Sequence, residues 1–297
     1  MNNPSNDPST AITPEQACDC HVHVFLDPAQ FPFATPRAYT PPPAGVEELV
    51  ALHAALGVGQ TVIVQPSVYG ADNSATLEGI RLLGPERARG VAVIDESIID
   101  PALARMHQAG IRGIRANLAL AGEEDPERAR RLLRGLADRV RPHGWHIQIY
   151  TGLKMIAALR DCLSDLPVPV VIDHFGGARG EGGTEQAGFA DLVSLVRSGQ
   201  AYVKLSAPYR SSERVPGYPD MAPLAQALIA ANPDRMLWGS DWPHPDASRT
   251  AGRQPGNISP RLPVNDQDVF DLLRIWAGDA VKLRKILVDN PAILYGF

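Results

Sequence analysis

Apolar residues along the chain fall into eight short runs, and stretches with the spacing of amphipathic helices separate most of them. The runs are almost continuously apolar, which is typical of parallel strands covered on both faces. They lie at residues 17–25, 61–67, 90–95, 113–118, 146–150, 169–175, 201–207 and 236–242. This alternation predicts an α/β fold built on a parallel sheet.

The helical stretches carry recognisable boundaries. One begins with Pro126 after acidic residues, another stops at Gly57, and both are ordinary helix-end signals. The last helix of the chain is expected to end before Pro291, because proline cannot continue a helix without losing a hydrogen bond. We expect helices at 46–56, 126–144, 153–163 and 221–232, and one within 279–297.

Eight strand–helix units in 297 residues predict one (β/α)8 barrel, the TIM-barrel fold. The alternative is an open, doubly wound sheet, but its G-x-G-x-x-G turn is absent after the first strand. No linker divides the chain, and the Pro-rich stretch 36–45 is a loop. We therefore expect a flexible tail over 1–15 and a single catalytic barrel domain over 16–297.

Charge and composition argue against several classes of partner. The net charge is −5 and no basic stripe is present, which disfavours nucleic acid. No apolar run reaches the ~20 residues that cross a bilayer, so no membrane partner is expected. The first fifteen residues are polar and do not form a secretory signal. Three cysteines indicate no disulfide framework, and a cytoplasmic location follows as the expectation.

Polar side chains gather where the predicted strands end, the place where such barrels carry their chemistry. His21 and His23 end the first run and share a face, because alternate strand residues point the same way. His174 follows the sixth run and Asp241 the eighth. A lone histidine there is usually structural, but burying all four without a use would be costly. We predict that they form the catalytic set.

Other residues near these strand ends receive supporting roles. Asp173 is expected to be a structural hydrogen-bond acceptor that points away from His174. Cys18 and Cys20 lie deeper in the first strand and are expected to pack in the core. Polar residues at the remaining strand ends include Gln65, Ser67, Asn117, Gln148, Tyr150, Lys204, Ser206 and His244.

These motifs resemble the amidohydrolase superfamily. The resemblance rests on the His-x-His of CDCHVHVF, the DH of IDHFGG, the aspartate of WGSDWPHP and the ending DNPAILYGF, and it spans nearly the whole chain. Together with FPFATPRAYTP, these stretches are most similar to amidohydrolase-related family 2, in the branch of 2-pyrone-4,6-dicarboxylate lactonase-like enzymes. The resemblance implies an amidohydrolase-type barrel and a hydrolase that opens a lactone ester.

The superfamily usually binds one or two divalent metals, with a strand-5 histidine and often a carboxylated strand-4 lysine as ligands. Here His146 stands at the start of its strand, and GIRANL contains no lysine. A binuclear site is therefore not expected, and the lactonase branch includes a metal-independent member. We expect no cofactor. The alternative is one zinc ion on His21, His23, His174 and Asp241, because three N/O ligands plus water suffice.

On the lactonase pattern the histidines polarise the lactone carbonyl and stabilise the oxyanion, and Asp241 takes the proton from water. Arginine suits carboxylates because of its bidentate fork. Two further arginines of the pattern are replaced by Ala121 and Gly177, which favours substrates with fewer charges, and Arg179 follows nearby. The expected substrate-binding residues are Tyr39, Ser67, Arg115, Tyr150 and Arg210.

The sequence thus predicts a catabolic hydrolase whose partner is a small anionic lactone, resembling a pyrone dicarboxylate, a muconolactone or a sugar-acid lactone. Two alternatives keep the same barrel: a lactone isomerase, and a zinc-dependent amidohydrolase or decarboxylase. A non-catalytic binding protein is a fourth possibility, and the intact catalytic set argues against it. Neither the exact substrate nor the oligomeric state follows from the sequence.

Overall fold

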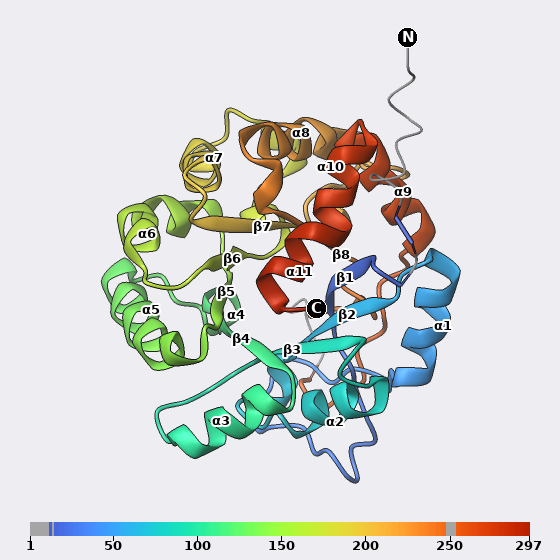
Figure 1. Cartoon of the computed structure of the whole chain (residues 1–297), viewed down its shortest axis with the longest axis vertical. Helices are drawn as coiled ribbons and strands as arrows, with labels where there is room; N and C mark the ends of the chain where they lie inside the picture. The colour runs from blue at the N-terminus through green and yellow to red at the C-terminus, as the bar shows by residue number, and fades with distance from the viewer. Residues whose placement is uncertain (1–11, 14, 248–253) are drawn as a thin grey trace.

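Eight parallel strands form the centre of the molecule (Figure 1). The computed structural model describes residues 12, 13, 15–247 and 254–297. Each strand pairs with the next along the chain, so the predicted barrel is confirmed and the doubly wound order is wrong. The strands are β1 (Cys18–Val22), β2 (Gln60–Val64), β3 (Ala88–Ala92), β4 (Ile111–Asn117), β5 (His146–Tyr150), β6 (Val170–Ile172), β7 (Ala201–Ser206) and β8 (Met236–Gly239).

The barrel closes where the ends of β1 and β8 meet. The backbone N–H of Asp241 donates to the carbonyl of His21 at 2.9 Å, and that of His23 donates to Trp242 at 2.8 Å. Gly239 permits this approach, since a Cβ there would stand 2.5 Å from the Cβ of His21. The seam between the first and last strands therefore requires glycine at this position.

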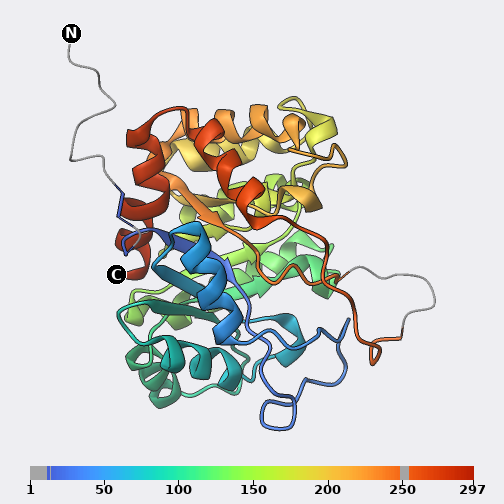
Figure 2. The ribbon, with the colours of Figure 1, turned by 90° about the vertical axis from the view of Figure 1, so that its right-hand side faces the viewer.

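Helices surround the strands, as the end-on and side views show (Figures 1 and 2). The predicted helices at 46–56, 126–144, 153–163 and 221–232 are confirmed to within a few residues. The helices are α1 (Val46–Leu56), α2 (Ser74–Leu83), α3 (Asp100–Gln108), α4 (Leu118–Ala121), α5 (Pro126–Val140), α6 (Leu153–Asp165), α7 (Phe189–Arg197), α8 (Ala222–Ala231), α9 (Asp266–Ala277), α10 (Ala280–Arg284) and α11 (Asn290–Tyr295).

The predicted stop before Pro291 is wrong. A π-helical turn, Lys285–Asp289, leads from α10 into α11, and Pro291 occupies the first turn of α11. Proline is tolerated there because the wider turn changes the hydrogen-bonding register before it. Five helices went unpredicted, namely α2, α3, α4, α7 and α9.

The amino ends of the strands form a closed apolar floor. Cys18 and Cys20 are fully buried there, which confirms their predicted core role. Helix α11 crosses this end of the barrel (Figure 1) and inserts Tyr295, which is also fully buried. His146 lies at the same level, with its ring 5.2 Å from that of Tyr295. The other floor residues include Val62, Val91, Val171 and Leu237.

The predicted tail, residues 1–15, lies almost entirely outside the described residues. Across the described ranges, no helix combines the length and the apolar character that a membrane crossing demands.

Candidate active site

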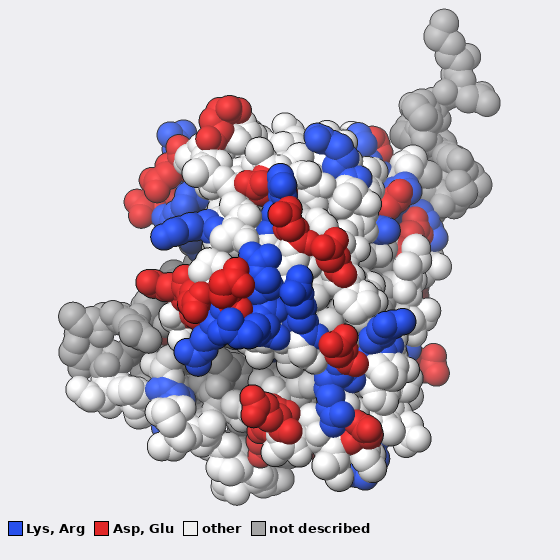
Figure 3. Space-filling model, turned by 90° about the vertical axis from the view of Figure 1, so that its left-hand side faces the viewer, with Lys and Arg blue, Asp and Glu red and all other residues white. Residues whose placement is uncertain are grey.

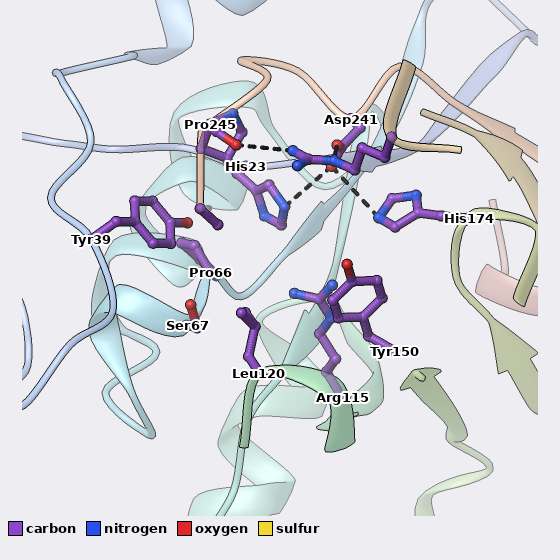
Figure 4. Close-up of a pocket in the computed structure, with 12 residues that line it drawn as sticks. His23, Tyr39, Pro66, Ser67, Arg115, Leu120, Tyr150, His174, Asp241 and Pro245 are labelled. Atoms are coloured by element: carbon purple, nitrogen blue, oxygen red, sulfur yellow. Dashed lines mark hydrogen bonds and ion pairs between the residues drawn. The ribbon is translucent and has the colours of Figure 1, made fainter. Parts of the chain in front are cut away.

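A small cavity of about 50 Å³ lies at the carboxyl ends of the strands (Figure 4). Eight of the nine predicted site residues line it, and His21 lies fully buried beside them. Four further residues complete the wall: Pro66, Leu120, Pro245 and Ala247. The residues that line the cavity and were predicted are His23, Tyr39, Ser67, Arg115, Tyr150, His174, Arg210 and Asp241.

Three imidazoles surround one oxygen of Asp241. The Nε2 atoms of His21 and His23 each lie 3.6 Å from Asp241 Oδ1, and that of His174 lies at 3.8 Å. These distances exceed a good hydrogen bond, so the three rings and the carboxylate face one another without bonding directly. The structure therefore brings the four predicted catalytic residues together around one point.

The backbone aims two of these side chains through left-handed conformations. His174 has φ 48° and Asp241 has φ 63°, values that residues other than glycine seldom adopt. Each such residue costs about 1–3 kcal/mol, and such strain is concentrated at functional sites. Each lies two residues beyond the end of a strand, where the chain turns sharply and directs the side chain into the barrel mouth.

The ring of His23 is held by a backbone carbonyl. Its Nδ1 lies 2.8 Å from the oxygen of Val64, so Nδ1 carries the proton and donates. In the neutral ring, Nε2 therefore presents a lone pair to the cavity. At that atom a neutral ring accepts a hydrogen bond or a metal ion, whereas the predicted role of His23 as a carbonyl donor needs a hydrogen there, and that role stays a prediction.

His21 has two competing partners behind its ring. The Lys204 ammonium and the Asp173 Oδ1 atom each lie 3.3 Å from His21 Nδ1. If Lys204 donates a hydrogen bond to Nδ1, the hydrogen of the neutral ring lies on Nε2. If Nδ1 instead donates to Asp173, Nε2 carries a lone pair. His21 Nε2 is buried and has no hydrogen-bond partner among the described residues. Burial holds the pKa of His21 well below its ordinary value, so the ring is neutral at pH 7.

His174 is supported by a hydroxyl. Its Nδ1 lies 2.8 Å from the Oγ of Ser206, which either donates or accepts. Burial lowers the pKa of His174 to about 4, since the nearby carboxylates offset this only in part. His174 is therefore neutral at pH 7 and presents Nε2 to the cavity.

A buried polar layer beneath the site went unassigned from sequence. Lys204 donates to Gln148 Oε1 at 2.7 Å, and Gln148 Nε2 donates to Asp173 Oδ2 at 3.1 Å. Asp173 accepts hydrogen bonds as predicted, but it faces His21 and is part of the site's support. The signal was present, since Gln148 and Lys204 are polar residues in the middle of otherwise apolar strands.

The second oxygen of Asp241 is occupied. Arg210 Nε lies 2.8 Å from Oδ2 and the Tyr209 hydroxyl donates to it at 2.7 Å. Burial alone would raise the pKa of Asp241, but Arg210 and the imidazoles hold it well below the ordinary value. Asp241 is therefore ionised at neutral pH. Tyr209 was missed because nothing in the sequence distinguishes it from a loop tyrosine.

Both predicted arginine anchors are already paired. Arg115 donates to Asp173 Oδ2 through Nε at 3.2 Å and through Nη2 at 3.0 Å. Besides its bond to Asp241, Arg210 donates through Nη2 to the carbonyl oxygen of Pro245 at 3.0 Å. Neither Nη1 atom donates a hydrogen bond within the described residues. Figure 4 shows Arg115 beside Tyr150 with its guanidinium directed into the cavity.

The surroundings explain part of the departure from the lactonase pattern. Gly177 has φ +70°, and a Cβ there would lie 3.1 Å from the Cα of Gly152, so a side chain would strain the turn. Arg179 does not line the cavity, because its Nη1 donates to the carbonyl of Arg210 at 2.8 Å.

The donor set also fits one metal ion. One ligand atom each of His21, His23 and Asp241 lies within 4.8 Å of the others, and the Val64 carbonyl fixes His23 as metal-binding histidines are usually fixed. A single zinc ion would use these residues, and His174 is the fourth candidate. His21 could take part only with its Nδ1 proton on the Asp173 side.

Comparison with known proteins gives a consistent result. A family model described as "Amidohydrolase" matches residues 18–297. The chain is 33% identical over 296 residues to a 4-sulfomuconolactone hydrolase of Hydrogenophaga intermedia, covering 97% of this chain and 91% of that protein. It is 35% identical over 291 residues to a 2-pyrone-4,6-dicarboxylate hydrolase of Comamonas testosteroni, covering 95% and 90%.

A more distant relative has a different reaction in its name. The D-galactarolactone isomerase of Agrobacterium fabrum is 26% identical over 289 residues, covering 95% of this chain and 91% of that protein. Among solved structures, an Acinetobacter baumannii protein named for 2-pyrone-4,6-dicarboxylic acid hydrolysis, with citric acid bound, superposes with a TM-score of 0.75 at 25% identity. That match covers 95% of this chain and 100% of the other.

Proposed function

The chain belongs to the amidohydrolase family, and on this premise we propose that it hydrolyses the lactone ester of a small carboxylated molecule. The observation that carries the proposal is the position of Asp241 Oδ1 among three imidazole Nε2 atoms. Relatives named as hydrolases of anionic lactones support the substrate class. The cytoplasmic location, the catabolic role and the absence of nucleic-acid and membrane partners stay predictions.

Asp241 and His23 activate the attacking water. A water molecule between them donates one hydrogen to Asp241 Oδ1 and the other to the lone pair of His23 Nε2. Asp241 accepts the proton as the water oxygen adds to the lactone carbonyl, which is general base catalysis. Because Arg210 and Tyr209 occupy Oδ2, the proton moves to Oδ1.

His21 and His174 stabilise the developing oxyanion. With the Lys204 ammonium donating to His21 Nδ1, His21 Nε2–H is an unused donor directed at the reacting carbonyl. Fixed donors in a water-poor site stabilise such an oxyanion at little reorganisation cost. When the tetrahedral intermediate collapses, Asp241 returns its proton to the ring oxygen, which leaves as the alcohol.

Charge in the site supports an anionic substrate. Arg115 and the buried Lys204 lie against Asp173, and Arg210 lies against Asp241, while His21 and His174 are neutral. The arginine nitrogens that these pairs leave unused favour an anion. We propose that the substrate carboxylate meets the remaining Nη1 atoms of Arg115 and Arg210, with Tyr39, Ser67 and Tyr150 as hydroxyl contacts.

We propose catalysis without a cofactor, since strand β4 carries no lysine and His146 lies at the floor beside Tyr295, away from the mouth. A zinc ion on His21, His23 and Asp241 would supply Lewis-acid polarisation of the carbonyl. Metal analysis of the purified protein is expected to find well under one equivalent of zinc, and a chelator is expected to leave turnover unchanged. A stoichiometric ion whose removal abolishes activity would overturn the cofactor-free proposal.

An experiment in oxygen-18-labelled water distinguishes hydrolysis from isomerisation. A panel of carboxylated lactones is incubated in H2(18)O and the products are examined by NMR and mass spectrometry. Hydrolysis is expected to place one heavy oxygen in the product acid. An isomerase moves the acyl group to another hydroxyl of the substrate and incorporates none, and that result would favour the isomerase named among the relatives.

A further inference from the structure

A wide groove adjoins the catalytic cavity. Its volume is about 1310 Å³, and Ser67, Arg115 and Leu120 line both spaces. The groove runs from the barrel mouth between α5 and the residues that follow β3. Figure 3 shows this side of the molecule, where Lys and Arg side chains gather in a patch beside Asp and Glu side chains.

The catalytic cavity alone is too small for a carboxylated lactone. At about 10–15 Å³ for each water, its 50 Å³ holds only a few waters, whereas a cavity known to bind benzene measures about 150 Å³. A lactone ring whose carbonyl reaches Asp241 must therefore extend through the shared wall. The groove is the adjoining space that can receive the rest of the molecule.

The wall of the groove that α5 forms can receive the apolar part of a substrate. Leu132 of α5 is 46% exposed, although leucine side chains are usually buried. Gly135 follows on the same helix, and a Cβ there would meet nothing within 4 Å. Glycine inside a helix costs about 1 kcal/mol relative to alanine, and here no packing contact requires it. Its effect is to widen the groove.

One groove cation has no partner among the residues that the structure describes. Arg128 pairs with Glu123 at 3.1 Å, and Arg139 pairs with Asp100 at 2.6 Å. For Arg131, the described part of the chain supplies neither an ion pair nor a hydrogen bond, although it lines the groove beside them. Arginine in this state can bind a carboxylate or sulfonate through its fork of N–H groups.

We infer that the groove is the subsite for an acidic arm of the substrate. The lactone ring enters the cavity, the arm lies over Leu132 and Gly135, and its terminal acid group meets Arg131. This inference rests on the proposed lactone hydrolysis and adds which lactones are selected, namely those with an acid group several bonds away from the ring.

The test compares three γ-lactones: neutral γ-valerolactone, 5-oxooxolane-2-carboxylate, and 4-(5-oxooxolan-2-yl)butanoate, whose acid lies on a three-carbon arm. Arg131→Gln is expected to lower kcat/KM for the butanoate about threefold to fivefold relative to the neutral lactone, through KM, as exposed charge pairs do. The loss is expected to shrink at high salt. The matched control is Arg134→Gln, which removes the same charge from α5 at a position that does not line the groove.

A binding measurement separates failure of the subsite from failure of the proposed function. The cyclopentanone analogue of the butanoate has no ester, so its affinity is measured by calorimetry whether or not any lactone is hydrolysed. Arg131→Gln is expected to weaken this binding by the same factor, with Arg134→Gln equal to wild type. Equal affinity of wild type and Arg131→Gln at low salt would overturn the subsite, and turnover of no lactone would overturn only the hydrolase proposal.

Discussion

The two ends of the barrel are built from the same eight strands, but their interiors differ. At the floor, Cys18, Val171 and Tyr295 fill the space with apolar contacts. At the mouth, His21, Asp173 and Lys204 are equally buried and are held by hydrogen bonds and charge. The change takes place within β1, where only two residues lie between Cys18 and His21.

This difference shows how one barrel divides its tasks. Burying a large apolar side chain contributes about 1.5–3 kcal/mol, so the floor stabilises the fold wherever its shape is filled. The mouth contributes strained backbone and buried charged groups, which a packing argument alone would not favour. We therefore expect changes at the mouth to alter turnover and changes at the floor to alter stability.

The largest expected effect lies at the mouth. Asp241→Asn is expected to fold and to lower kcat about 10²–10⁴-fold, because an amide cannot accept the proton of water. Circular dichroism checks the fold and steady-state kinetics measure the loss. Asp161→Asn, a change of the same kind at an acid that is 81% exposed, is the matched control. Turnover within a few-fold of wild type would remove Asp241 from the mechanism.

A floor variant is expected to show the opposite behaviour. Tyr295→Ala is expected to lower the free energy of unfolding by about 3–5 kcal/mol, as large aromatic truncations do. Tyr295→Phe is expected to cost nothing, since the buried hydroxyl has no partner among the described residues. Denaturant unfolding measures both variants. A tenfold drop in kcat for folded Tyr295→Ala would contradict the division between floor and mouth.

Lys204 lies at the boundary and sharpens the comparison. Lys204→Met keeps the length of the side chain but removes the donor to His21 Nδ1, so the His21 proton is expected to move to the Asp173 side. The expected loss is about 10–100-fold in kcat, the usual size for a partner that orients a site histidine. Nitrogen-15 NMR reports the His21 tautomer, and an unchanged tautomer would show that Lys204 does not set it.

The smallest expected effect depends on pH and concerns His146 at the floor. Burial lowers its pKa to about 3, against an ordinary value near 6.5. The unfolded chain therefore binds more protons between these values, and folding stability decreases as pH falls below 6.5. The decrease attributable to His146 between pH 7 and pH 5 is about 2 kcal/mol.

His146→Leu is expected to remove that part of the pH dependence. Denaturant unfolding of wild type and variant at pH 7 and pH 5 measures it. The acid dependence due to His21 and His174 remains in the variant, because burial lowers their pKa values too. An identical difference between the two pH values in both proteins would show that His146 is not kept neutral by the fold.

The sequence predicted the barrel because its signals are local and repeated. Apolar runs, Pro126 and Gly57 each mark an element without knowledge of the rest. Helix α9 had such a signal as well, since the side chain of Asn265 caps its first turn, but no prediction used it. The continuation through Pro291 depends on a π-helical turn that spacing alone does not reveal.

The site could be predicted in its members but not in its protonation. Strand ends brought His21, His23, His174 and Asp241 to one place. The hydrogen state of each ring depends on distant residues, such as the Val64 carbonyl behind His23. Such partners join positions far apart in sequence through the barrel's geometry, so the chain order does not disclose them.

The seam at Gly239 has a consequence for the order of assembly. The backbone contacts that close the barrel, His21 to Asp241 and His23 to Trp242, involve three of the four catalytic residues. A folding chain with β1 through β7 in place would hold most of the apolar interior and yet lack the base. Recovery of turnover during refolding therefore reports the docking of β8 onto β1, while fluorescence or circular dichroism reports the growth of the sheet as a whole.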